Sequence, residues 1–131
     1  MKKHFVLFVL LIVFSVILSA CGGGASTKID VVMDDFSFTP GTVEVAAGQE
    51  ITVTVTNNGT EEHEFVIFKE GFNAGDKFGA EDEDNIYWEV EALPGETKTE
   101  TFTAPAAGIY YVTCGIEEHL EKGMSGYLIV K

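Results

Sequence analysis

From residue 28 onward, apolar and polar residues alternate along short stretches of the chain. The clearest stretch is ITVTVTN (51–57), in which Ile51, Val53 and Val55 share one face and threonines take the other. A period of two is typical of a strand with one buried face. The same pattern predicts strands in IDVVM (29–33), FSFTP (36–40), VEVAAG (43–48), EFVIF (64–68), ETFTA (100–104), IYYVT (109–113) and YLIV (127–130).

Turn signals separate these strands at intervals suited to a β-sandwich or barrel. TPGT, AAGQ, TNNGT, LPGE and APAAG combine glycine, proline and asparagine, which favour tight turns. The sequence contains no long helical period and no repeat. We therefore expect residues 28–131 to form a single all-β domain, large enough to bury one core.

One segment, residues 69–90, departs from this rhythm. KEGFNAGDKFGAEDEDNIYWEV is long and glycine-bearing, and it contains four consecutive acids, Glu81–Asp84. We expect a loop or short helix that crosses between sheets, with the acid run as a solvated turn. Tyr87 and Trp88 are interpreted as core or rim packing residues, the more common role of such side chains.

The N-terminus carries the features of an export signal. MKKHFVLFVLLIVFSVILSAC has a basic start, an apolar run and small residues before a cysteine,. The run from Phe5 to Leu18 is shorter than the ~20 residues of a membrane span, although a count that includes Ala20 leaves an uncleaved anchor as an alternative. LSAC resembles the lipobox of bacterial lipoproteins. This resemblance implies a signal peptide over residues 1–20, a lipid on Cys21, and anchoring to the outer face of the cytoplasmic membrane.

Residues 21–27, CGGGAST, predict a flexible tether between lipid and domain,. At ~3.5 Å per residue, such a tether holds the domain within ~20 Å of the bilayer.

The chain is strongly acidic. Eight lysines and no arginine stand against 21 acidic residues, and the formal net charge of -13 becomes -15 when Lys2 and Lys3 leave with the signal. Nucleic acid is not expected as a partner, because phosphate would be repelled. A partner with a basic surface fits this charge, and so does a general adaptation to solubility or high salt.

The chemistry of the mature chain is concentrated in four residues. With Cys21 assigned to the lipid, Cys114 is a lone thiol in an oxidising compartment. His63 and His119 are then the only histidines left. A type 1 copper site needs a thiolate, two imidazoles and a weak axial thioether, and these residues together with Met124 supply that set. We therefore predict one copper ion, bound by three ligands from the loop before YLIV and by a histidine at the start of EFVIF.

Other interpretations of these residues stay open. A tetrahedral zinc site is an alternative, but one thiolate, two imidazoles and a thioether form an unusual set for zinc. Cys114 alone also fits a small buried hydrophobe. A cysteine–histidine nucleophile would need a third group to orient His119, and the sequence does not clearly identify one.

C-x4-H-x4-M after an upstream histidine resembles the plastocyanin/azurin family of blue copper proteins, the cupredoxins. FSFTPGTVEVAAGQEITVTVTN resembles the opening strands of the family, HEFVI its first ligand strand, and LPGETKTETFTAPAAGIYYVTC the approach to the cysteine. The spacing is similar to that of auracyanin and other membrane-tethered members. The resemblance implies a Greek-key β-sandwich with copper near one end, which carries single electrons to a partner such as a cytochrome or an oxidase.

Two features depart from the family pattern. Many members follow the first histidine with an asparagine that ties the two ligand loops together, whereas this chain has Glu64. Many also have a proline–glycine step before the second histidine, whereas GIEEHLEKG places Glu117, Glu118 and Glu121 around His119. In the family this histidine edge is the electron exit, so the resemblance implies an exit with an acidic rim.

The predicted ligand set also bears on function. If protein groups fill the strong positions, no position is open for a substrate, and we expect electron transfer and no enzyme activity. The alternative is a copper-delivery or copper-buffering lipoprotein of the cell envelope, and a metal-free interaction domain comes third. A binuclear copper domain would need a second cysteine in the ligand loop, and residues 115–124 contain none.

Overall fold

A computed structural model describes residues 24–131, so the predicted signal peptide and Cys21 lie outside the described residues. The strands are β1 (Lys28–Asp34), β2 (Ser37–Thr39), β3 (Thr42–Val45), β4 (Glu50–Asn57), β5 (His63–Phe68), β6 (Ile86–Ala92), β7 (Thr97–Thr103), β8 (Gly108–Thr113) and β9 (Ser125–Val130). One 3-10 helix, η1, spans Glu83–Asn85. Within the described part of the chain, no helical segment has the length and hydrophobicity of a membrane span.

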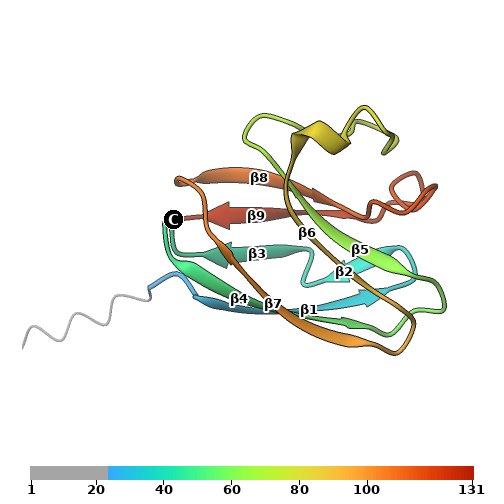
Figure 1. The fold of residues 1–131 in the computed structure, drawn as a ribbon, viewed down its shortest axis with the longest axis horizontal. Helices are drawn as coiled ribbons and strands as arrows, with labels where there is room; N and C mark the ends of the chain where they lie inside the picture. The colour runs from blue at the N-terminus through green and yellow to red at the C-terminus, as the bar shows by residue number, and fades with distance from the viewer. Residues whose placement is uncertain (1–23) are drawn as a thin grey trace, which may run out of the picture.

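The strands form two sheets that face each other (Figure 1). The four-stranded sheet has the order β2-β1-β4-β7, and the five-stranded sheet has the order β3-β9-β8-β5-β6. The pairs β1–β4 and β3–β9 are parallel, and the other neighbouring strands run antiparallel. The expected all-β sandwich is therefore confirmed.

Strand β4 shows how the alternating pattern builds the core. Ile51, Val53 and Val55 are buried among residues of both sheets. Each such side chain contributes roughly 1.5–3 kcal/mol when it leaves water. The threonines of this strand point outward, and two of them, Thr54 and Thr56, contact threonines of β7 at an Oγ1–Oγ1 distance of 3.1 Å. A single pattern thus places apolar groups in the core and hydroxyl groups on the surface.

The prediction for residues 69–90 was wrong in two respects. Residues 86–92 form strand β6, and this strand pairs with β5 in the same sheet, so the segment does not cross between sheets. The crossing comes later, through residues 93–96, which connect β6 to β7. The strand was missed because only Val90 and Ala92 of β6 are buried, which makes its alternation hard to separate from the acidic loop before it.

Residues 69–85 lie over the outer face of the five-stranded sheet. Val66 and Phe68 are fully buried although they lie outside the core between the sheets. Phe78 packs on Phe68 with ring centroids 6.2 Å apart. In the acid run three of the four residues are exposed, as a solvated turn requires.

Tyr87 and Trp88 are packing residues, as expected. Trp88 stacks on Phe102 at a centroid distance of 5.0 Å. The Tyr87 hydroxyl donates to the Thr103 carbonyl at 2.7 Å. Both contacts join β6 to β7 across the edge of the sandwich.

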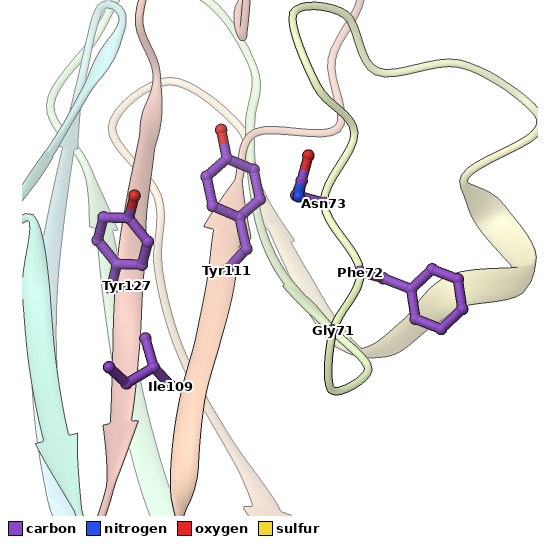
Figure 2. A pocket seen from close by; sticks show the side chains of 6 residues that line it. All are labelled: Gly71, Phe72, Asn73, Ile109, Tyr111 and Tyr127. Carbon is purple, nitrogen blue, oxygen red and sulfur yellow. The ribbon is translucent and has the colours of Figure 1, made fainter.

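A pocket lies between the outer face of the five-stranded sheet and the segment 69–85 that covers it (Figure 2). It is lined by Gly71, Phe72, Asn73, Ile109, Tyr111 and Tyr127. None of these residues belongs to the predicted ligand set, so this pocket is not the predicted metal site.

The two ends of the sandwich differ (Figure 1). The start of the described chain and the C-terminus lie at one end, and the loop between β8 and β9 lies at the opposite end. Ser26 forms a β-bridge with Val45, and the Thr27 carbonyl accepts a hydrogen bond from the Thr52 N–H at 2.9 Å. Two residues that the sequence places in the tether therefore bond to the domain.

Candidate metal centre

Three of the four predicted ligands meet at the end of the sandwich that carries the β8–β9 loop. His63, Cys114 and His119 each place one ligand atom within 4.8 Å of the other two. The Nδ1 atoms of the two histidines are 3.1 Å apart, and Sγ of Cys114 lies 3.4 Å from Nδ1 of His119. His63 begins β5, whereas the other two residues come from the loop after β8. The fold therefore joins donors that are about fifty residues apart in sequence.

The three side chains are almost completely shielded from solvent. The exposed fraction is 0% for His63 and Cys114 and 1% for His119. Polar groups with this degree of burial need partners, because an unpaired buried polar group costs about 1–3 kcal/mol.

Met124, the fourth predicted ligand, closes the same loop and is fully buried. Its carbonyl accepts a hydrogen bond from the Cys114 N–H at 3.1 Å, and its N–H donates to the His119 carbonyl at 3.1 Å. These two bonds hold the backbones of all three loop residues at fixed separations.

The loop turns through two residues with positive φ. Gly123 has a φ of 98°, which glycine adopts without a steric penalty,. Glu118 has a φ of 67°, which costs a non-glycine residue on the order of 1 kcal/mol or more,. Strain of this kind persists where the surrounding structure holds the backbone in place, here beside His119.

Two carboxylates that sequence reasoning missed contact the outer ring nitrogens of the histidines. Oδ1 of Asp35 lies 3.2 Å from Nε2 of His63, and Oε2 of Glu61 lies 3.0 Å from Nε2 of His119. Asp35 is in the turn between β1 and β2, and Glu61 precedes β5 but contacts the histidine of the other loop. No local spacing signals either contact, because the paired residues are 28 and 58 positions apart in the sequence and only the fold brings them together.

Asp35 is itself held in place by Thr60. The Thr60 N–H donates to Oδ1 at 2.8 Å, and the Thr60 hydroxyl donates to Oδ2 at 2.7 Å. These two hydrogen bonds lower the pKa of Asp35 to about 2. The ionised carboxylate can only accept hydrogen bonds, so Nε2 of His63 carries the proton in this contact.

The donor set fits a bound cation. A neutral imidazole with its proton on Nε2 has a free lone pair on Nδ1. The two Nδ1 lone pairs and the sulfur of Cys114 then converge in a buried space, where they repel one another unless a proton or a metal ion lies among them. One soft sulfur with two imidazoles is the set that copper prefers.

Cys114 lies in an environment that opposes an isolated thiolate. Burial raises the pKa of the thiol, although the Glu64 N–H donates to Sγ at 3.4 Å. A metal cation reverses this balance, because a coordinating thiol is deprotonated by the metal.

Glu64 occupies the position at which many cupredoxins have asparagine, and it does join the two ligand segments. Besides its backbone contact with Cys114, its carboxylate lies over Gly115, where a Cβ atom would come within 2.1 Å of Oε2. Burial, followed by the charges of Glu89 and Glu91, raises the pKa of Glu64 to about 7.

The surface around His119 is not bare. The Phe36 ring packs edge-on against His119 at a centroid distance of 5.0 Å, and the Lys122 ammonium lies 4.4 Å from the centre of that ring. Glu61 caps the outer nitrogen of His119. The three glutamates of the predicted rim are all exposed: Glu117, Glu118 and Glu121. The outer edge of this histidine is therefore shared between an aromatic ring and a carboxylate.

Comparison with known proteins identifies a family and a relative that the chain resembles. Residues 6–130 match the family model described as Cupredoxin-like domain. Auracyanin-A from Chloroflexus aurantiacus is 31% identical over 146 aligned residues, which cover 88% of this chain and 90% of that protein.

Two solved structures resemble the described fold. The dithionite-reduced auracyanin of Roseiflexus castenholzii has a TM-score of 0.72 and 32% identity, over 82% of this chain and 99% of that one. Auracyanin A of Chloroflexus aurantiacus, described as a "blue" copper protein, has a TM-score of 0.65 and 30% identity, over 79% of this chain and 98% of that one.

Proposed function

The chain belongs to the cupredoxin family, and on that premise we propose that it is a membrane-tethered type 1 copper protein that carries single electrons between redox partners. Its cofactor is one copper ion in a type 1 site. Electron transfer by a blue copper centre agrees with the similarity to the auracyanins. We further propose the identity of the ligands, the lipid tether and the kind of partner.

We assign the copper ligands to His63, Cys114, His119 and Met124. The observation that carries this assignment is the buried convergence of two Nδ1 atoms and one Sγ atom within 4.8 Å. Met124 is assigned as the axial thioether because its backbone is hydrogen-bonded to two of the other ligands in the same loop. A thiolate, two imidazoles and a weak axial thioether form the ligand set of blue copper.

Bound copper supplies a one-electron couple, and the protein supplies a site that changes little during the transfer. The ligands are buried, and the loop that carries three of them is closed by its own hydrogen bonds. No strong position is left for a substrate, which favours electron transfer over catalysis. Burial also slows ligand exchange, which favours a carrier over a copper-delivery protein.

The position of the proposed tether is consistent with this role. The described chain starts at the end of the sandwich opposite the β8–β9 loop (Figure 1). A lipid on Cys21 would therefore hold the domain with its copper end pointing away from the bilayer, on the outer face of the cytoplasmic membrane. A partner would then reach the copper without displacing lipid.

The proposed partner is a redox protein with a basic docking surface, such as a cytochrome or an oxidase. The formal net charge of the chain is -13. The glutamates beside His119 are exposed, so their charges can attract a cationic surface at long range,.

Stopped-flow kinetics tests carrier against delivery protein. The Cu(I) protein is mixed with an oxidised basic cytochrome, and haem reduction is followed at increasing salt. We expect fast one-electron transfer that slows with salt, while copper stays bound in the presence of a Cu(I) chelator. Copper loss to the chelator that is faster than electron transfer would contradict the carrier function and favour delivery.

Cell fractionation tests the tether separately. We expect Cys21→Ala to release the protein from membranes, because lipid attachment and signal processing both depend on that sulfur. Retention of the variant in the membrane fraction would contradict lipid anchoring and support an uncleaved N-terminal helix.

A further inference from the structure

We propose that Asp35 and Glu61 are positioning residues, each of which orients one copper-binding histidine and biases the bound metal towards Cu(II). The inference rests on the copper site proposed above. It concerns two carboxylates from different loops, each in contact with the ring nitrogen that faces away from the ligand cluster.

The first half of the pair is rigid. Asp35 is held by the backbone N–H and the hydroxyl of Thr60, and its Oδ1 atom accepts from Nε2 of His63 at 3.2 Å. His63 itself is fixed by the register of β5. The imidazole is therefore held between a sheet and an anchored carboxylate.

The second half is looser and closer to solvent. Oε2 of Glu61 lies 3.0 Å from Nε2 of His119, and the Glu61 side chain is 52% exposed. Among the described residues, the Glu61 carboxylate makes no other hydrogen bond or ion pair within the usual distances. Glu61 thus contacts the solvent and His119 together, at the edge where a redox partner would approach.

Both contacts select the same tautomer. A carboxylate that accepts from Nε2–H leaves Nδ1 unprotonated and directed at the metal. Partners of this kind orient metal-binding histidines and raise their basicity. Both histidines of the proposed copper site, His63 and His119, have such a partner.

The electrostatic consequence has a definite sign. Cu(II) carries one positive charge more than Cu(I), so a nearby negative charge stabilises the oxidised state more. A more basic imidazole acts in the same direction, because it donates more strongly to the harder ion. Removing either carboxylate charge should therefore raise the reduction potential.

The test compares substitutions at these positions with the same change one residue away. Asp35→Asn and Glu61→Gln remove the charge but keep an acceptor oxygen. Their matched controls are Asp34→Asn and Glu62→Gln, because neither neighbour hydrogen-bonds a histidine. We expect each test variant to lower the ratio of Cu(II) to Cu(I) affinity about tenfold. This change raises the reduction potential by ~59 mV for a one-electron couple. The controls should change this ratio by less than about threefold, because neither carboxylate is hydrogen-bonded to a ligand histidine and solvent screens its charge,.

A second readout separates the contact from the charge. In the diamagnetic Cu(I) full-length protein, the Nε2–H protons of His63 and His119 are observed by NMR. Asp35→Ala should speed exchange of the His63 proton with water by at least about tenfold and leave that of His119 unchanged, and Glu61→Ala should do the reverse.

The outcomes are separable from the function proposed above. Equal potentials in each test variant and its control, or unchanged proton exchange in the alanine variants, would overturn the positioning role. A wild-type protein that binds copper without blue colour would instead overturn the copper site itself. Raised potentials with site-specific proton exchange would support the role of both carboxylates.

Discussion

His63 and His119 lie side by side, with ring centroids 4.9 Å apart, but two different kinds of structure hold them. His63 begins β5, where it is in register with Ala92 of β6, and β5 also pairs with β8. Its position follows from the sheet. His119 lies in a loop without strand partners, and it is held by the bonds from its N–H to the Ile116 carbonyl and from the Met124 N–H to its own carbonyl, both 3.1 Å.

The difference separates stability from chemistry. The strand side is part of the hydrogen-bonded frame, so damage there should lower the free energy of unfolding. The loop side supplies three of the four proposed ligands but little of the core, so damage there should alter the copper more than the fold. The substitutions below test this separation from the largest expected effect to the smallest.

Cys114→Ser should remove the visible absorption of the Cu(II) protein completely. The band depends on charge transfer from a thiolate, and serine offers no soft anionic sulfur. Thr113→Ser is the matched control, because it changes the neighbouring buried residue and keeps its hydroxyl. Visible spectroscopy of both copper-loaded variants checks the prediction, and a coloured Cys114→Ser protein would show that the thiolate is not a ligand.

Asn57→Ala should lower the free energy of unfolding by about 3 kcal/mol. The fully buried Asn57 amide donates to the carbonyls of Glu61 and Ala92 and accepts from the Gly59 N–H, each at 2.8 Å. Loss of such partners leaves buried groups unpaired, at about 1–3 kcal/mol each. Urea titration of the metal-free protein measures the change.

Asn58→Ala is the control for this substitution, since Asn58 is exposed and hydrogen-bonds through its backbone. We expect a change within about 0.5 kcal/mol for it. If the two variants were equally stable, the buried hydrogen bonds of Asn57 would not contribute to the frame that holds His63.

Met124→Gln should keep the copper and lower its reduction potential by ~59 mV. This shift corresponds to an increase of about tenfold in the affinity for Cu(II) relative to Cu(I). The amide oxygen is a harder ligand than the thioether and favours Cu(II). Met33→Leu changes the other fully buried methionine, which lies in the core, and should leave the potential unchanged. Voltammetry distinguishes the two, and an unchanged potential in Met124→Gln would place that residue outside the coordination sphere.

The smallest effect is expected from the exposed rim, in the triple variant Glu117→Gln, Glu118→Gln, Glu121→Gln. Each charge is screened by solvent, and Glu118 is also paired with Lys122 at 3.8 Å. The potential of the triple variant should rise by on the order of 20 mV in total at low salt. Electron transfer to a basic cytochrome should slow at low salt and match wild type at high salt.

A variant that lacks three exposed glutamates elsewhere provides the control: Glu44→Gln, Glu50→Gln and Glu100→Gln. It has the same net charge as the rim variant. If both variants slowed electron transfer equally, total charge would matter and the rim would not be the docking surface.

The sequence predicted those parts of the fold that a period of two encodes. Residues 51–57 form a strand in both the prediction and the structure, because apolar and polar side chains alternate there without interruption. Strand β6 was missed because its Tyr87, Glu89 and Glu91 are exposed and its sequence continues an acidic loop.

The candidate site divides in the same way. The loop residues Cys114, His119 and Met124 could be grouped from the sequence because their spacing is local. Asp35 and Glu61 could not be identified, since each contacts a histidine that is far away in the sequence and is brought close only by the fold. The outer edge of His119 shows this limit most clearly. The sequence suggested an acidic rim at residues 117–121, whereas the carboxylate in contact with Nε2 of His119 belongs to Glu61.

The most direct test of the copper assignment is a combined visible and EPR spectrum of the full chain loaded with one equivalent of Cu(II). The buried set of His63, Cys114 and His119 predicts one copper per chain, an intense thiolate-to-copper band and the small copper hyperfine splitting of a highly covalent Cu–S bond,. A colourless protein with the wide splitting of a nitrogen and oxygen site would contradict the account, because it would exclude Cys114 from the metal centre.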